Sequence, residues 1–263
     1  MTNPNPIGFF DSGVGGTSIW KEVISLLPCE NTIYLADSAN APYGEKPSEE
    51  IIDLSIKNTE KLLEMGCKLI VVACNTATTN AISHLRASYP VSFIGIEPAI
   101  KPAALSSQTK VIGILATRGT LSSELFYKTS ELYARDIKII EVEGKGLVRL
   151  IEAGKHQSAE IRELLLNLLE PMLKARIDYL VLGCSHYPYL LPILKSILPA
   201  RVKIIDSGEA VARQTKKILE ENNLLNIPSG KTHHRFYTNV DPSVLSTIIE
   251  ADSLGYEVSY LRF

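Results

Sequence analysis

The chain has 263 residues, of which 45% are hydrophobic and 21% charged, and its formal net charge is −2. This composition is typical of a globular protein with a sizeable core and excludes a disordered chain. The absence of a basic arm or charge run argues against a nucleic-acid surface, and no apolar run approaches the roughly 20 residues that span a bilayer.

Short runs rich in β-branched residues alternate with longer amphipathic segments along the chain. Strands are predicted at 7–10, 32–36, 69–73, 92–96, 111–115, 138–142, 179–182 and 202–205, and helices at segments such as 17–27, 48–65, 120–134, 159–174 and 209–222. This alternation indicates βαβ units and mostly parallel sheets with right-handed crossovers.

A glycine-rich turn, DSGVGG, follows the first predicted strand at residues 11–16. Backbone amides at such a turn, just before a helix, favour an anion. The dinucleotide pattern G-x-G-x-x-G is incomplete, because Ser18 stands at its third position. We therefore predict a small anion, such as a substrate carboxylate, bound by Ser12 and backbone amides. A tight turn that needs glycine only for its backbone conformation is the alternative.

The stretch 68–80, KLIVVACNTATTN, begins as a buried strand and ends in small polar side chains. Ligands of open parallel sheets bind beyond the carboxyl ends of strands, which is where Cys74 stands. A lone cysteine is more often a core residue. However, Cys184 has a matching position after the run YLVLG, and His186 follows it. This faint repeat predicts two related α/β domains facing each other across a cleft.

Two separate thiols on opposite faces of a small substrate suit a two-base inversion at carbon. One thiolate removes a proton, and the opposite thiol returns one to the other face. A cysteine hydrolase needs a single nucleophilic thiol, a redox pair is commonly Cys-x-x-Cys, and the cysteine spacing does not suit zinc. The inversion needs no metal or cofactor. Asp11 on the Cys74 side and His186 on the Cys184 side could serve as acid–base partners that adjust the ionisation of the thiols.

The motifs DSGVGG, ADSANAPYG, ACNTAT and LGCSHYP, in this order and spacing, resemble glutamate racemases of the aspartate/glutamate racemase superfamily. The resemblance covers the chain from Ile7 to about Val211. It implies cofactor-independent interconversion of L- and D-glutamate, which supplies D-glutamate for peptidoglycan. It also implies two similar doubly wound α/β domains with mostly parallel sheets and the active site in the cleft between them. The domains would be residues 1–97 with 207–263, and residues 98–206.

The resemblance also assigns roles to individual residues. Cys74 would act on D-glutamate and Cys184 on L-glutamate. Asp11 and His186 would assist as acid–base groups, with Glu152 as a further assisting carboxylate. The substrate-binding residues that it implies are Ser12, Pro42, Tyr43, Gly44, Asn75, Thr76, Thr117, Thr120 and Ser185.

One residue departs from the family pattern, because Ser185 stands where the family usually has threonine. Serine keeps the hydroxyl and the backbone amide, so the departure concerns packing in the pocket more than chemistry. The expected partners are a small-molecule substrate and a second copy in a homodimer, with no nucleic acid and no membrane. The N-terminus shows no signal-peptide pattern, which predicts a cytoplasmic protein with reduced cysteines.

Three alternative functions remain open at this point. A racemase for a related acidic amino acid such as aspartate is the nearest, although the DSGVGG and GCSHYP versions of the motifs favour glutamate. A nucleotide-dependent α/β enzyme would use the turn at 13–16, and its incomplete glycine pattern argues against this function. An idle amino-acid-binding module would leave the two strand-end cysteines unexplained.

Overall fold

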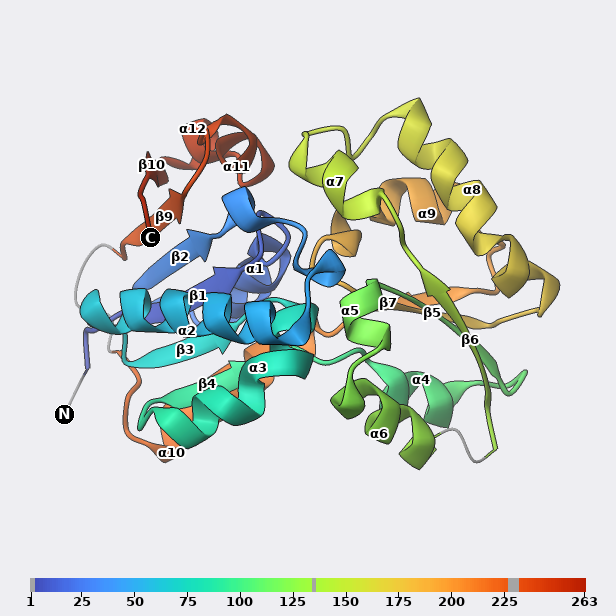
Figure 1. Ribbon diagram of the computed structural model, residues 1–263, viewed down its shortest axis with the longest axis horizontal. Helices are drawn as coiled ribbons and strands as arrows, with labels where there is room; N and C mark the ends of the chain where they lie inside the picture. Colours follow the sequence, from blue (N-terminus) through green and yellow to red (C-terminus); the bar gives the residue numbers. More distant parts are fainter. Residues whose placement is uncertain (1–2, 134–135, 227–231) are drawn as a thin grey trace.

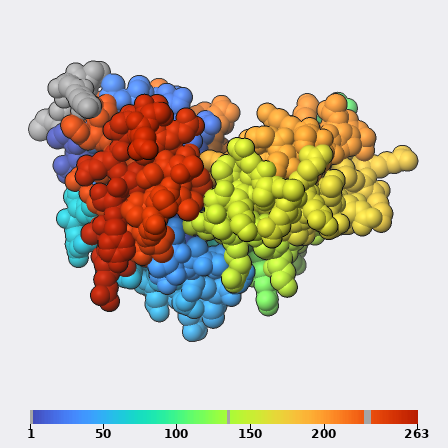
Figure 2. Space-filling model, turned by 90° about the horizontal axis from the view of Figure 1, so that it is seen from above, coloured from blue at the N-terminus to red at the C-terminus, as the bar shows by residue number. Residues whose placement is uncertain are grey.

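The computed structural model describes residues 3–133, 136–226 and 232–263. The chain forms two sheets, each with helices on both faces, and the two halves lie beside each other (Figure 1). Seen from above, they form two lobes that touch in the middle of the molecule (Figure 2). Every strand pairing among the described residues is parallel, so the predicted α/β class with two mostly parallel sheets is confirmed.

The first lobe contains six strands in the order β10-β9-β2-β1-β3-β4. Two C-terminal strands therefore complete the sheet of the N-terminal ones. The strands are β1 (Ile7–Asp11), β2 (Thr32–Ala36), β3 (Leu69–Val72), β4 (Ser92–Gly95), β9 (His234–Thr238) and β10 (Glu257–Tyr260). The helices are α1 (Thr17–Leu26), α2 (Ser48–Glu64), α3 (Asn75–Ser88), α10 (Gly208–Glu221), α11 (Ser243–Ile248) and α12 (Ala251–Leu254), with short 3-10 turns η1 (Ser38–Asn40) and η2 (Tyr43–Glu45).

The second lobe contains four strands in the order β6-β5-β7-β8. They are β5 (Val111–Ala116), β6 (Lys138–Glu143), β7 (Tyr179–Gly183) and β8 (Lys203–Ile205). The helices are α4 (Ile100–Ser106), α5 (Arg118–Leu121), α6 (Glu124–Tyr133), α7 (Leu147–Glu152), α8 (Ala159–Lys174) and α9 (Leu191–Ile197), with a 3-10 turn η3 (Tyr187–Leu190). Across the described ranges, no helix has both the length and the apolar character needed to cross a membrane.

Central strands of both sheets, such as β3 (LIVV) and β5 (VIGILA), are apolar because both of their faces are buried. In β1, Ile7 and Phe9 belong to one apolar cluster with Trp20 of α1. Phe10, on the opposite face, belongs to another cluster with Leu62 of α2. Parallel sheets covered by helices on both sides require such runs. Burial contributes about 1.5–3 kcal/mol for each large apolar side chain, which fixes these strands as the frame of the site.

Both sheets reverse their winding direction beside a central strand. The chain passes from β1 to β2 on one side and returns to β3 on the other, and β5, β6 and β7 repeat this arrangement. Ligands of doubly wound sheets bind at the carboxyl edge of such a switch point. Asp11 and Cys74 lie at the first switch point, and Thr117 and Cys184 lie at the second. The fold therefore provides two candidate edges for one site.

The prediction of one continuous helix at 120–134 is wrong, because the chain forms two helices there, α5 and α6. Ser123 interrupts the run: its Oγ accepts a hydrogen bond from the Phe126 N–H at 3.3 Å and so starts α6. Ala134 lies outside the described residues.

The domain boundaries at 97/98 and 206/207 stay a prediction. Near them, Ser207 Oγ donates to the Glu97 carbonyl and joins the two connecting segments.

Candidate active site

The turn at 11–16 holds the side chain of Asp11, which is completely buried. The Gly13 and Gly16 N–H groups donate to Asp11 Oδ2 at 3.2 and 3.0 Å. Ser185 Oγ, from the second lobe, donates to Asp11 Oδ1 at 3.1 Å. The amides of Gly13 and Gly16, expected to bind a substrate anion, thus bind a carboxylate of the chain itself. Burial raises the pKa of Asp11, and the charge of His186 partly offsets this effect.

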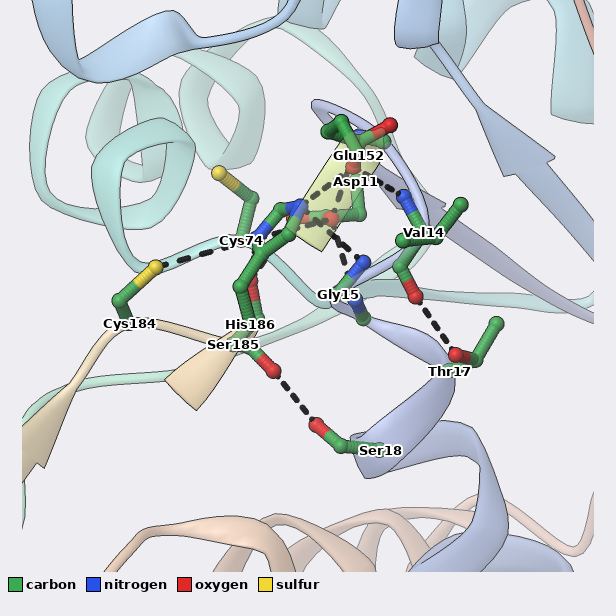
Figure 3. Close-up of polar contacts among 12 residues, drawn as sticks. Asp11, Val14, Gly15, Thr17, Ser18, Cys74, Glu152, Cys184, Ser185 and His186 are labelled. Carbon is green, nitrogen blue, oxygen red and sulfur yellow. Dashed lines mark hydrogen bonds and ion pairs between the residues drawn. The ribbon is translucent and has the colours of Figure 1, made fainter. Parts of the chain in front are cut away.

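The same turn also contacts two side chains of the second lobe (Figure 3). The Val14 N–H donates to Glu152 Oε1 at 2.7 Å, and the Gly15 nitrogen lies 3.3 Å from His186 Nε2. A Cβ atom at Gly13 would overlap the Glu152 carboxylate, and one at Gly15 would overlap the His186 imidazole. These glycines therefore allow close approach between the lobes, beyond the needs of a tight turn.

Cys74 stands at the N-terminus of α3, where its Sγ accepts a hydrogen bond from the Ala77 N–H at 3.4 Å. Its side chain is almost buried, and only 4% of the residue surface is exposed. Burial raises the pKa of the Cys74 thiol well above its usual value, and the negative charge of Asp11 raises it further. Cys74 is therefore a protonated thiol at neutral pH.

Cys184 follows β7 and lies beside an imidazole–carboxylate pair. Its Sγ is 3.8 Å from His186 Nδ1, and His186 Nε2 is 2.5 Å from Glu152 Oε1. Asp11 Oδ2 lies 3.9 Å from His186 Nδ1. Burial alone would lower the pKa of His186, but Cys184, Glu152 and Asp11 together raise it well above its usual value.

The two thiols lie on opposite sides of the boundary between the lobes, close enough to interact electrostatically. A charge on Cys184 acts on the Cys74 thiol and raises its pKa, and Figure 3 shows the two side chains entering from different sheets. The five predicted acid–base residues thus form one connected group. Within the described ranges, no three His, Cys, Asp or Glu side chains are arranged to hold a metal ion.

Three threonine hydroxyls form a second group across the boundary. Thr76 Oγ1 lies 2.8 Å from Thr117 Oγ1 and 3.3 Å from Thr120 Oγ1. A Cβ atom at Gly44 would lie 2.7 Å from Thr117 Cβ, so only glycine lets this loop approach the hydroxyls so closely. A hollow beside them is lined by Pro42, Gly44, Glu45, Thr117, Arg118, Glu143, Gly144, Lys145, Gly146, Val148 and Arg149.

The other predicted binding residues differ in how they present their polar atoms. Asn75 Oδ1 is buried and has no hydrogen-bond partner within the part of the chain that the structure describes. Tyr43, in contrast, donates its hydroxyl to the buried carboxylate of Asp37 and accepts from Asn58 at 3.0 Å. Asn75 therefore offers a free acceptor, whereas the hydroxyl of Tyr43 anchors its own loop.

Ser38 is a site residue that the sequence reasoning missed. Its Oγ donates to Glu152 Oε2 at 2.9 Å, so Glu152 binds two segments of the first lobe. Ser38 lies in the loop after β2, and the only signal in the sequence was its place beyond the end of a strand.

We expect Asp11→Asn to accelerate alkylation of Cys74 by iodoacetamide at neutral pH. The thiolate is the reactive form, and the charge of Asp11 adds to burial in raising the Cys74 pKa. Removing that charge lowers this pKa, so more thiolate is present at a given pH. Peptide mass spectrometry measures the rate, with the partly exposed Cys29 as an internal control. An unchanged ratio of the two rates would contradict this electrostatic coupling.

The chain is similar in sequence and in structure to known racemases. The profile described as Asp/Glu/Hydantoin racemase matches residues 21–215. A glutamate racemase of Herpetosiphon aurantiacus is 44% identical over 243 residues, 92% of this chain and 96% of the relative. One of Ectopseudomonas mendocina is 48% identical over 84% of each chain. The Escherichia coli glutamate racemase, solved with L-glutamate and the activator UDP-MurNAc-ala, superposes with a TM-score of 0.87 at 32% identity, covering 98% of both chains.

Proposed function

The chain belongs to the Asp/Glu/hydantoin racemase family and is a glutamate racemase. We propose that Cys74 and Cys184 perform the racemisation as two opposed acid–base groups. The observation that supports this mechanism most is that two nearly buried thiols stand at the switch points of two different sheets and interact electrostatically. Each thiol has its own ionisable partners, Asp11 for Cys74 and His186 for Cys184.

The proposed reaction starts from L-glutamate, with Cys184 as the base. The Cys184 thiolate takes the proton from Cα and becomes a thiol, while the electron pair of the broken C–H bond stays on a planar carbanion next to the carboxylate. The Cys74 thiol then gives its proton to the opposite face and becomes a thiolate. D-glutamate reacts by the reverse sequence, so no external acid, base or electron carrier is consumed.

The surroundings of the two thiols support these roles. Cys74 keeps its proton because burial and Asp11 raise its pKa, which makes it ready to donate. His186 Nδ1 lies 3.8 Å from the Cys184 sulfur, which places the imidazole as the partner that exchanges protons with this thiol in the proposed mechanism. Two groups of one chemical type thus take opposite roles because their surroundings differ.

Substrate recognition is proposed to divide between the two polar groups at the boundary. The hydroxyls of Thr76, Thr117 and Thr120 can donate to a carboxylate, and the unpartnered Oδ1 of Asn75 can accept from the α-ammonium group. The backbone and side chains of Ser12, Pro42, Tyr43, Gly44 and Ser185 complete the proposed walls.

Deuterium incorporation tests the proposed function directly. The reduced enzyme is incubated with L-glutamate, and separately with D-glutamate, in D2O without added cofactor. We expect the optical rotation to decay to zero while deuterium enters Cα, because the donating thiol exchanges its proton with solvent. If neither change occurs in either incubation, the two-thiol mechanism is wrong.

Two further experiments separate the alternatives. Racemisation of aspartate as fast as glutamate would favour the related acidic racemase. Tight binding of NAD or ATP in a titration would favour the nucleotide-dependent enzyme. We also propose, on the resemblance alone, a cytoplasmic homodimer that supplies D-glutamate for peptidoglycan.

A further inference from the structure

Tyr189 contacts the start of α1 in the first lobe, outside the groups considered so far. Its hydroxyl lies 2.6 Å from Thr17 Oγ1, and Thr17 is completely buried. Lys21 Nζ lies 5.6 Å from the centre of the Tyr189 ring, a distance at which a cation attracts an aromatic face. The phenol is therefore fixed at both its ring and its hydroxyl.

The direction of the hydrogen bond between Tyr189 and Thr17 follows from counting protons. Thr17 Oγ1 has one hydrogen, and it lies 2.6 Å from the Val14 carbonyl, which can only accept. Thr17 thus donates to Val14, so Tyr189 must donate to Thr17. The result is a directed chain from the Tyr189 O–H through the Thr17 hydroxyl to the Val14 carbonyl (the last step is drawn in Figure 3).

The chain continues from Val14 to the imidazole. The Val14 N–H donates to Glu152 Oε1, and the same oxygen lies 2.5 Å from His186 Nε2. The Tyr189 N–H in turn donates to the His186 carbonyl at 3.2 Å. The contacts therefore close a ring that crosses between the lobes twice and holds the turn, Glu152 and the imidazole in one arrangement.

We propose that Tyr189 is a positioning residue for the acid–base group at Cys184. Its hydroxyl, acting through Thr17, fixes the turn at Val14, and the Val14 N–H holds Glu152 against His186. Tyr189 itself contacts neither thiol in this chain of bonds, so it acts only through other residues. This inference rests on the proposed racemase function, and it assigns to that function a residue in the η3 turn.

Tyr189→Phe tests the proposal, because it removes only the hydroxyl and keeps the ring. We expect kcat to fall about tenfold with little change in KM. Removing an acid–base group lowers the rate by about 10²–10⁴-fold, and misplacing it should lower the rate by less. Thr17→Val, which removes the hydroxyl, should lower kcat similarly. Thr17→Ser, which keeps the hydroxyl, should have a kcat close to that of the wild type. Tyr89→Phe, which loses a hydrogen bond to Glu60 far from the ring of contacts, is the matched control.

A double-mutant cycle then distinguishes positioning from general destabilisation. If Tyr189 acts through Glu152, Tyr189→Phe in a Glu152→Gln background should lower kcat by less than twofold, because the two substitutions break the same path. A full tenfold loss in that background would overturn the proposal. So would wild-type kcat in Tyr189→Phe, or an equal loss in Tyr89→Phe.

A second readout does not depend on catalysis. The pKa of His186 is measured by NMR of the imidazole in the unliganded enzyme, where Cys184, Asp11 and Glu152 are the ionisable groups that raise it. Tyr189→Phe should lower this pKa, because Glu152 moves away, and Tyr89→Phe should leave it unchanged. An unchanged pKa in Tyr189→Phe refutes the positioning role. A lowered pKa in a protein that racemises nothing would instead locate the failure in the proposed function.

Discussion

Cys74→Ser and Cys184→Ser should each abolish racemisation of both glutamate enantiomers. Every turnover uses both sulfur atoms, one as base and the other as acid, so the loss of either stops both directions. A serine hydroxyl does not ionise near neutral pH, and removal of an acid–base group costs about 10²–10⁴ in rate. Polarimetry with either enantiomer as substrate measures the loss. Because enantiomers have equal free energy, kcat/KM must fall equally in the two directions.

The two variants should nevertheless differ in a partial reaction. Cys74→Ser retains the thiol proposed to act on L-glutamate and should still exchange the Cα proton of L-glutamate with D2O without inversion. Cys184→Ser should do the same with D-glutamate. Cys29→Ser, at a partly exposed cysteine in the turn after α1, is the control and should keep full activity. Full racemisation by either site variant would remove that thiol from the mechanism.

The sequence located the two thiols because they stand at strand ends, which local patterns reveal. The predicted strand at 32–36 matches β2 residue for residue, and the one at 69–73 differs from β3 by a single residue. In a parallel sheet the end of a strand already places a side chain at the ligand-binding edge. The approximate positions of Cys74 and Cys184 were therefore predictable without any tertiary information.

The contacts that hold the acid–base groups in place were harder to predict, because they join distant parts of the chain. Val14 and Glu152 are separated by 138 positions, and Thr17 and Tyr189 by 172. No periodicity or spacing rule connects such pairs. The amides of the glycine turn show the same limit. Their geometry suited an anion, but only the fold reveals that the Asp11 carboxylate occupies part of it.

The close packing between the lobes makes the glycine turn the most sensitive backbone segment of the site. A Cβ atom at Gly15 would lie 2.2 Å from His186 Nδ1, 2.4 Å from its Cγ and 2.6 Å from its Cε1. The imidazole is buried and held by Glu152, so it cannot simply swing away. Relief of the clash must therefore either displace the ring from Cys184 or separate the two lobes.

Gly15→Ala should accordingly lower kcat/KM by about 10²-fold or more, since displacement of a catalytic group by about 1 Å has effects of that size. Gly15 does not have a positive φ, so alanine suits its backbone and the fold should survive, with an overpacking cost of about 1–3 kcal/mol. Circular dichroism and thermal unfolding check the fold, and polarimetry the activity. Gly208→Ala is the matched control, because its Cβ would meet Cγ of the exposed Glu22 at 2.9 Å, a side chain that can move. Wild-type activity in Gly15→Ala would show that the lobes can separate enough to admit the methyl group without loss of catalysis. The close fit between the turn and the imidazole would then not be a requirement of the reaction.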